Sequence, residues 1–314
     1  MRLSPDQLKQ YHDDGFLLVR DVFDRQELEP LKEEINEQVD ALAQGLLQAG
    51  KITNLHEDKD FYHRLTALER DFPGAAVLIH IGGVLRPQLA ALWSSPKLLD
   101  MIEQLLGSEI AGHPVWNLRS KTPTNSLVTV PWHQDTAYLS EGCEHTFQPT
   151  AWIPLIDADA ENGTLQVIRG AHRLGRVLPH QLENRKGNKA SWYLYIDQAD
   201  LPPGEVVTCN MPMGSVLLLN QLLPHRSTEN YSSRIRWSVD LRWQRPGERH
   251  GLEGVKDPIL MRTAANPDYK IDWAGWAERG RVPKTKDDFD SLVSGPWMDR
   301  WSSSDLSSQK AHQN

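Results

Sequence analysis

The spacing of apolar residues predicts that the first section of the chain, residues 1–109, is mainly helical. Along one expected helix, apolar side chains recur every three or four residues, at Leu28, Leu31, Ile35, Val39 and Leu42. Asp24 and Glu27 form a capping box at its start. Two further helices are predicted to begin at Ser4-Pro5 and at Ser95-Pro96, because serine caps a helix and proline suits its first turn. We expect these helices to act as a scaffold.

The pattern changes in residues 110–243, where short β-rich runs replace the helical spacing. Pro, Gly, Asn and Asp interrupt these runs at near-even intervals, which is typical of a barrel or a sandwich. Asn162-Gly163 is typical of a turn that links two strands, and we interpret it as a purely structural hairpin. The predicted strands, including one in the first section, are Phe16–Val19, Ser126–Pro131, Thr150–Ile156, Thr164–Ile168, Glu205–Cys209, Ser215–Asn220 and Ile235–Trp243.

The last section, residues 244–314, is rich in Gly, Pro, Lys and Asp. It carries four of the eleven tryptophans, Trp273, Trp276, Trp297 and Trp301. We predict a C-terminal wrap that docks these aromatic side chains on the core and frays at Ser302–Asn314. The three sections together are expected to form one domain spanning residues 1–314.

Charge and composition exclude several classes of protein. The net charge is −8 and the pI is near 5.8, so a nucleic acid is not an expected partner. The apolar runs are too short to span a bilayer and the N-terminus is polar, so we expect neither a membrane segment nor a signal peptide. Two cysteines without a C-x-x-C pair fit a reducing compartment, and we predict a cytoplasmic protein. Glycine-rich nucleotide-binding loops and the G-x-S-x-G motif are missing from the sequence.

A candidate metal site begins with His133 and Asp135 in the run V-P-W-H-Q-D-T-A-Y-L. If this run is a strand, residues two apart point to the same face and both side chains reach one ion. His225, 90 residues beyond Asp135 (225 − 135), follows a predicted strand and supplies a third ligand. Two imidazoles and one carboxylate form the facial triad of non-haem iron(II), which leaves coordination positions open for chemistry. The H-x-D pattern by itself is weak evidence in a chain with 12 histidines.

A candidate anion site follows the distal histidine. Arg236 and Ser238 share one face of a predicted strand, and a guanidinium beside a hydroxyl suits the binding of a carboxylate. Arg234 would share that face and competes with Arg236 for the same role, although Ser238 favours Arg236. A surface arginine on an edge strand is the plain alternative for either residue.

With these motifs in order, the chain resembles the phytanoyl-CoA dioxygenase family of iron(II)- and 2-oxoglutarate-dependent oxygenases. The resemblance covers most of residues 5–243. It rests on L-S-P-D-Q-L-K-Q-Y-H-D-D-G-F, P-W-H-Q-D-T-A-Y, A-W-I-P-L-I-D-A-D-A-E-N-G-T-L-Q-V and P-H-R-S-T-E-N, together with the R-x-S pair. It implies a mainly β fold with flanking helices, namely a double-stranded β-helix (a cupin-like jelly-roll barrel).

The resemblance also implies roles for individual residues. His133, Asp135 and His225 match the family's iron ligands, and Arg236 matches the arginine that pairs with the distal carboxylate of 2-oxoglutarate. Ser227 and Trp152 match other co-substrate contacts, Ser238 supports Arg236, and Asn117 is expected to line the pocket. Lys121 is interpreted as a surface lysine, and His172 and His180 as structural residues. Trp116 and Trp132 suggest an aromatic wall, which core packing would explain equally well.

The resemblance implies a dioxygenase that uses iron(II), 2-oxoglutarate and O2 to oxidise a C–H bond of a small-molecule metabolite, releasing succinate and CO2. A carboxylate at Asp135 favours hydroxylation, or desaturation or ring chemistry by the same oxidant, over halogenation, because related halogenases have a small non-ligating residue there. Two other interpretations stay open: a metal-dependent hydrolase or isomerase on a cupin-like barrel, and a non-catalytic ligand-binding jelly roll. The hydrolase or isomerase interpretation leaves Arg236 and Ser238 unexplained, and an intact triad with its arginine argues against the non-catalytic jelly roll.

Overall fold

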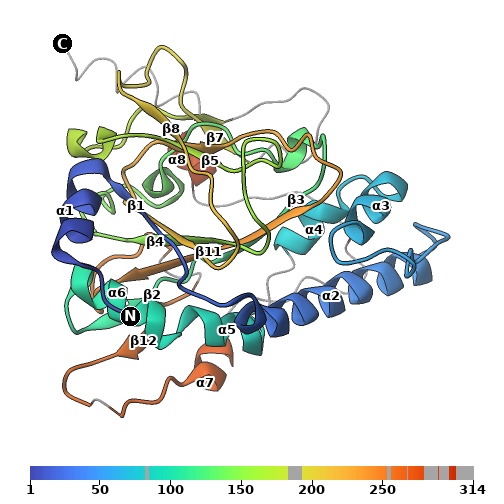
Figure 1. Ribbon diagram of the computed structural model, residues 1–314, viewed down its shortest axis with the longest axis horizontal. Coiled ribbons are helices and arrows are strands. Elements are labelled where there is room, and N and C mark those ends of the chain that lie inside the picture. Colours follow the sequence, from blue (N-terminus) through green and yellow to red (C-terminus); the bar gives the residue numbers. More distant parts are fainter. Residues whose placement is uncertain are drawn as a thin grey trace.

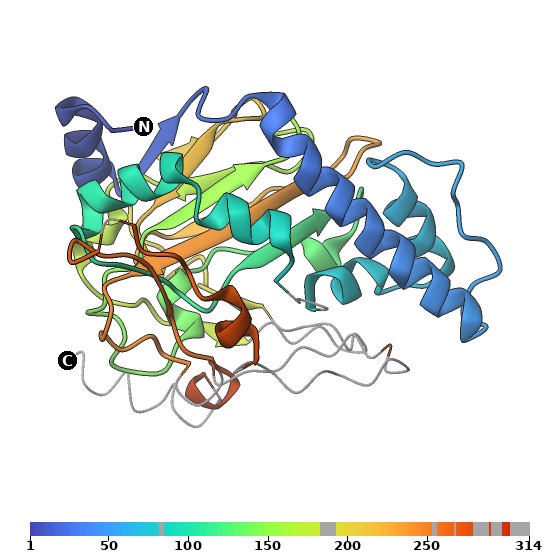
Figure 2. The ribbon, with the colours of Figure 1, turned by 90° about the horizontal axis from the view of Figure 1, so that it is seen from below.

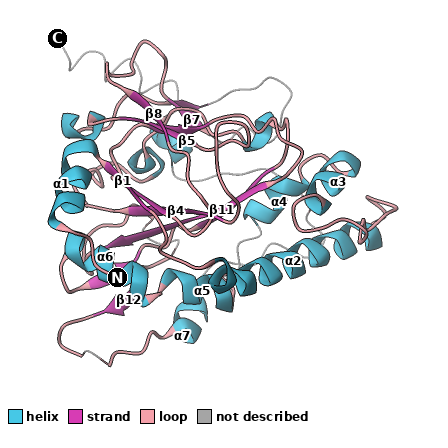
Figure 3. Cartoon of the chain, in the orientation of Figure 1, coloured by secondary structure: helices cyan, strands magenta, loops and turns pink. Residues whose placement is uncertain are grey.

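The computed structural model describes residues 1–81, 85–182, 193–252, 256–266, 268–278, 289 and 297–301. The strands form two antiparallel layers, which Figure 3 shows one above the other. The larger sheet has the order β1-β9-β4-β11-β2-β12, with β3 also paired to β11, and the smaller has the order β10-β5-β8. This arrangement is a double-stranded β-helix, as the sequence predicted.

Most of the predicted strands form, with small shifts at their ends. The strands of the larger sheet are β1 (Phe16–Val19), β2 (Ile110–Gly112), β3 (Asn117–Lys121), β4 (Thr150–Pro154), β9 (Val216–Leu219), β11 (Arg236–Gln244) and β12 (Ile259–Arg262). Those of the smaller sheet are β5 (Leu165–Ile168), β8 (Val206–Thr208) and β10 (His225–Ser227), and a separate pair consists of β6 (Gln181–Leu182) and β7 (Leu194–Tyr195).

The helices of the first section cover one face of the larger sheet. They are α1 (Pro5–Asp14), α2 (Arg25–Gln48), α3 (Arg64–Asp71), α4 (Ala75–Ile81), α5 (Pro87–Trp93) and α6 (Pro96–Leu106). Figure 1 shows the long helix α2 below the strands, and Figure 2 shows α2, α5 and α6 lying across them. Both predicted capping boxes form: the Ser4 hydroxyl accepts from the Gln7 amide at 3.2 Å, and the Asp24 amide donates to Glu27 at 2.8 Å.

Side chains alternate along β11 between two environments. Its odd-numbered residues, Trp237, Val239, Leu241 and Trp243, are fully buried among the covering helices in the main hydrophobic core. Its even-numbered residues are polar or charged and face the space between the two sheets, since successive side chains of a strand point to opposite faces. The fold therefore places charged groups inside the barrel, where only partnered charges are tolerated.

Two sequence predictions about local structure were wrong. Residues 126–128 form a 3-10 helix, η1 (Ser126–Val128), in place of the predicted strand Ser126–Pro131, because the Asn125 side chain caps the Leu127 amide. Asn162-Gly163 does form a turn, and Gly163 has φ +90°, but the strands on either side of it, β4 and β5, belong to different sheets. The turn therefore carries the chain from one layer to the other instead of closing a hairpin.

The described part of the last section packs its tryptophans as predicted. Trp273 and Trp276, in α7 (Trp273–Glu278), contact the ring of Trp93. Trp297 begins the short helix α8 (Trp297–Arg300), and Trp301 follows it and is buried. Both contact the segment after Asp135. The predicted fraying of Ser302–Asn314 lies outside the described residues.

Candidate metal centre and its cavity

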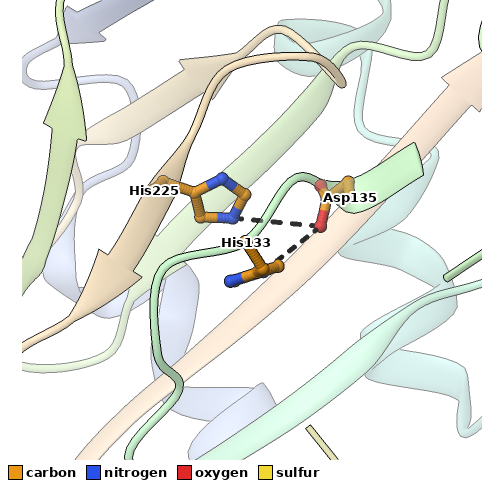
Figure 4. Close-up of side chains that lie close together, drawn as sticks. All are labelled: His133, Asp135 and His225. Carbon is orange, nitrogen blue, oxygen red and sulfur yellow. Dashed lines mark ion pairs between the residues drawn. The ribbon is translucent and has the colours of Figure 1, made fainter. Parts of the chain in front are cut away.

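His133, Asp135 and His225 come together between the two sheets. Their ligand atoms all lie within 4.8 Å of one another, and Asp135 Oδ1 lies 3.9 Å from the Nε2 atom of each histidine (Figure 4). The two histidines form a β-bridge, in which each backbone amide donates to the other residue's carbonyl at 2.9 Å. Residues 92 positions apart (225 − 133) are therefore fixed side by side by their own backbones.

Backbone carbonyls fix the tautomer of both imidazoles. Nδ1 of His133 lies 2.8 Å from the carbonyl of Pro131, and Nδ1 of His225 lies 2.9 Å from that of Leu223. A carbonyl only accepts, so Nδ1 of each ring carries a proton, and Nε2, which faces Asp135, is the nitrogen whose lone pair the neutral ring offers to a metal. This is the arrangement in which histidine binds a metal, with the second nitrogen held by an outer partner. The donor set thus fits a divalent ion such as iron(II).

Asp135 is not on a strand, contrary to the prediction, because it begins the 3-10 helix η2 (Asp135–Tyr138). Its carboxylate is held instead by two side chains of the larger sheet. Arg242 donates from Nη2 to Oδ1 at 2.8 Å and from Nε to Oδ2 at 3.1 Å, and the Thr150 hydroxyl donates to Oδ2 at 2.9 Å. A bidentate guanidinium fixes the plane of a carboxylate, so Oδ1 stays turned toward both histidines.

Burial and charge set the protonation states at this centre. Burial lowers the pKa of His133 well below its usual value, and neighbouring His225 lowers it further, so the ring is neutral near pH 7. Burial by itself would raise the pKa of Asp135, but the charge and hydrogen bond of Arg242, together with His225 and His133, outweigh burial and lower it. A neutral imidazole beside an ionised carboxylate is the form that coordinates a cation.

Arg236 lies in the same cavity as the three metal-ligand candidates, and Arg234 lies outside it. The Arg236 side chain is buried, its Nε donates to the carbonyl of Gly163 at 3.2 Å, and its Nη1 donates to the hydroxyl of Ser238. Burial lowers its pKa to about 10. Arg234 is exposed, precedes β11, and stacks on the ring of Tyr62. The structure separates two arginines that the sequence pattern left as competitors.

Lys121 is buried, and its interpretation as a surface lysine was wrong. Its Nζ donates to the hydroxyls of Ser227 at 2.9 Å and Thr129 at 3.0 Å. Burial lowers its pKa well below the usual value, and the nearby charge of Arg236 lowers it further. Gly163 accommodates this side chain, since a Cβ there would lie 2.5 Å from Lys121 Cδ. A buried guanidinium and a buried amine with mainly neutral partners make this end of the cavity suited to an anion, which would favour the charged form of both.

The remaining predicted contacts divide between the cavity and its surroundings. Trp152 lines the cavity, and the guanidinium of Arg236 lies 5.1 Å from its ring centre. Ser227 also lines the cavity, whereas Asn117 lies beside it and donates to Asp240 at 3.3 Å. Trp132 and Trp116 pack in hydrophobic clusters, so core packing accounts for both.

His180 and His172 bond to backbone groups rather than to the side chains of the three metal-ligand candidates. His180 is fully buried, and its Nε2 accepts from the backbone amide of Gln134 at 3.0 Å. His172 Nε2 lies 3.0 Å from the carbonyl of His12 at the end of α1.

Sequence reasoning missed three charged residues of the cavity, Arg242, Arg119 and Asp240. Arg119 Nε donates to Asp240 Oδ2 at 2.8 Å, which gives the cavity a second ion pair beside that of Arg242 and Asp135. For Asp240 and Arg242 the signal was present in R-W-S-V-D-L-R, where every second residue from Arg236 to Arg242 is polar, whereas Arg119 lies on β3. That alternation places all of them on the face that carries Arg236.

A double-stranded β-helix with a buried His-Asp-His cluster defines the class of this protein. The sequence profile described as phytanoyl-CoA dioxygenase (PhyH) matches residues 11–238. The chain belongs to this family, which confirms the resemblance inferred from its motifs.

Known proteins similar to the chain agree with this assignment. An ectoine dioxygenase of Bordetella bronchiseptica is 27% identical over 54% of this chain and 50% of its own length, so the chain matches half of that relative. A probable phytanoyl-CoA dioxygenase of Caenorhabditis elegans is 24% identical over 76% of this chain and 74% of its own. The non-heme alpha-ketoglutarate-dependent carbocyclase SnoK from nogalamycin biosynthesis has the same fold, with a TM-score of 0.50 at 20% identity over 80% of this chain and 88% of its own.

Among the described residues, every helix is too short or too polar to cross a membrane.

Proposed function

We propose that the protein is an iron(II)- and 2-oxoglutarate-dependent dioxygenase that hydroxylates a C–H bond of a small-molecule metabolite. The observation that carries the proposal is one cavity that holds both a set of metal-ligand candidates and a buried cation suited to a carboxylate. His133, Asp135 and His225 converge in it, and the buried cation Arg236 lines it as well. Membership of the phytanoyl-CoA dioxygenase family and a relative named ectoine dioxygenase support the same reaction class.

In this proposal the three convergent side chains hold the metal on one face. The lone pairs of both Nε2 atoms and Asp135 Oδ1 point into the same space, and Arg242 with Thr150 keeps the carboxylate from turning away. Bound iron(II) supplies the redox chemistry by which O2 converts 2-oxoglutarate to succinate and CO2 and delivers the second oxygen atom to a C–H bond. The protein's own contribution is fixed ligand geometry inside a buried cavity.

The anion end of the cavity would receive the distal carboxylate of 2-oxoglutarate. Arg236 offers a guanidinium oriented by Ser238 and Gly163, and Lys121 and Ser227 supply further donors on the adjoining strands. Trp152, beneath the guanidinium, gives the carbon chain an apolar wall. An anion placed there would also stabilise the charged forms of Arg236 and Lys121, which burial and their mutual repulsion disfavour.

The two other interpretations explain less of the cavity. A hydrolase or isomerase built on the same metal site needs no second, cationic end, and a ligand-binding jelly roll needs no metal-ligand set with fixed tautomers. Asp135 occupies the third ligand position with an ionised carboxylate, which favours hydroxylation over halogenation.

The test is succinate formation from 2-oxoglutarate by the purified protein under air. We expect turnover that requires added iron(II), is lost with a chelator, and rises when a substrate is supplied from a panel of small metabolites. A protein that never forms succinate under these conditions, but hydrolyses or isomerises a substrate with zinc or manganese, would support the alternative.

A further inference from the structure

We propose that Trp297, Arg300 and Trp301 form a C-terminal clamp that positions the metal-binding segment, residues 133–139. These three residues define the clamp. They lie about 160 positions along the chain from that segment and outside residues 11–238, the part that the family profile matches. The inference rests on the proposed metal site and concerns residues that act through Asp135 and His133, not residues that touch the metal.

The clamp binds the open end of the 3-10 helix that Asp135 begins. Arg300 Nη1 donates to the carbonyl of Leu139 at 2.7 Å and to that of Thr136 at 3.3 Å. Trp301 Nε1 donates to the carbonyl of Ala137 at 2.8 Å. The last carbonyls of a helix lack partners within it, and a cation there also interacts favourably with the helix dipole. The amide of Leu194 also donates to the Tyr138 hydroxyl at 2.9 Å, so the clamp adds to an anchored turn the donors that bind its last carbonyls.

Ring contacts extend the clamp to both ends of the segment. Trp297 packs edge-on against Tyr138 with ring centres 5.5 Å apart, and Tyr138 packs in the same way against His133 at 5.6 Å. Trp301 is 4% exposed and packs on the ring of His180, whose Nε2 accepts from the amide of Gln134.

Position matters because the ligand atoms must converge on one point. The two histidines are fixed to each other by their β-bridge, whereas Asp135 is the first residue of η2. A tilt of η2 would therefore move the carboxylate relative to the histidines. Arg242, on β11, holds the carboxylate side chain, and the clamp binds the backbone of residues 136–139 that follows Asp135. Outer partners of metal ligands commonly change metal affinity by about 10- to 100-fold when removed.

The test is the affinity of the metal-free protein for Mn²⁺, with free ion measured by its electron paramagnetic resonance signal. We expect Trp301→Phe, which keeps a ring but loses the indole N–H, to weaken Mn²⁺ binding about 10-fold. We expect Arg300→Ala to do the same, and Arg300→Lys to recover most of the affinity because lysine still donates to carbonyls.

Matched controls separate positioning from general destabilisation. Trp276 is also buried, and its Nε1 donates to the backbone carbonyl of Asp257 at 2.7 Å, away from the metal-ligand candidates. Arg245 Nε donates to the carbonyl of Leu106 at 2.8 Å. Trp276→Phe and Arg245→Ala should leave Mn²⁺ affinity within twofold of the parent protein.

The outcomes distinguish this inference from the proposed function. If Trp301→Phe and Arg300→Ala bind Mn²⁺ as tightly as the parent, or if the controls weaken binding equally, the clamp inference is wrong while the metal site stands. If the parent binds no Mn²⁺ and His133→Ala changes nothing, the proposed metal site itself is wrong.

Discussion

At the scale of single residues, the chemistry of the cavity depends on partners that lie far away in sequence. His133 is neutral because burial and His225 disfavour its charge, whereas Asp135 stays ionised because Arg242 and the two histidines together outweigh burial. Each protonation state is the one that a divalent cation needs. The same side chains on an exposed surface would titrate near their ordinary pKa values and would have no common focus.

The first residue-scale prediction concerns the metal ligands. His133→Ala or Asp135→Ala removes one of three convergent ligands, so succinate formation should fall to the level without enzyme. His172→Ala is the control, because that histidine bonds to the carbonyl of His12 and should retain activity. Undiminished succinate release in both ligand variants would refute the metal assignment.

The second residue-scale prediction separates the two arginines. Arg236→Ala should raise the KM for 2-oxoglutarate by about 10- to 100-fold, since a hydrogen bond between charged groups contributes about 1.5–3 kcal/mol. Arg234→Ala should leave this KM unchanged, because Arg234 is exposed and stacks on Tyr62. Steady-state kinetics at varied 2-oxoglutarate measures both, and the reverse pattern would move the co-substrate anchor to Arg234.

At the scale of elements, β11 joins the core to the site. Its nine residues are all buried, yet neighbours along the strand serve different purposes. Leu241 is 0% exposed in the hydrophobic core, and Ser238, three positions earlier, bonds the guanidinium of Arg236 in the cavity. The pleat of one strand thus supports stability on one face and binding on the other.

This alternation predicts two separable mutational effects. Leu241→Ala should lower the free energy of unfolding by about 2–5 kcal/mol, the usual cost of emptying a core site, while the KM for 2-oxoglutarate of the folded fraction stays the same. Ser238→Ala should raise that KM with about 1 kcal/mol or less of lost stability. Urea denaturation and steady-state kinetics on both variants test the pair, and a shared change in both quantities would contradict it.

At the scale of the whole molecule, the barrel buries histidines that serve stability. Burial lowers the pKa of His180 to about 3 and that of His113 to about 3. The unfolded chain protonates a histidine near pH 6.5. Their contribution to stability is therefore complete above about pH 6.5 and is lost as the pH falls toward 3, because only the unfolded state takes up the protons in that window.

The corresponding prediction is a change in the pH dependence of stability. As the pH falls from about 6 to about 4, each buried histidine should lower the free energy of unfolding by about 1.4 kcal/mol for every pH unit. His180→Gln keeps an acceptor for the Gln134 amide and a donor for the Leu178 carbonyl but cannot titrate. Urea titrations of the metal-free protein at several pH values give the slope of the free energy of unfolding against pH. This slope should be smaller in His180→Gln than in the parent by the equivalent of about one proton, and equal slopes would contradict the prediction.

The local pattern was enough to predict elements and the candidate ligands. Apolar spacing and capping boxes located α1 and α2, and β-rich runs located β4, β5 and β9, because these signals act within a few residues. It failed at Ser126–Pro131 and at Asp135, where a side-chain cap and a 3-10 turn decide the backbone. It also failed at Lys121, since burial of a lysine depends on strands that pair from elsewhere in the chain.

By itself, the sequence determined the fold class, the family and the identity of the ligand candidates. Those follow from residue types and spacings that act locally or recur among related chains. The tertiary structure decided which charges share one cavity. It placed Arg236 in the cavity and Arg234 outside it, paired Arg242 with Asp135 and Arg119 with Asp240, buried Lys121 beside Ser227, and brought the last tryptophans onto the metal-binding segment. These contacts join residues up to about 160 positions apart, and only the closing of the two sheets brings such residues together.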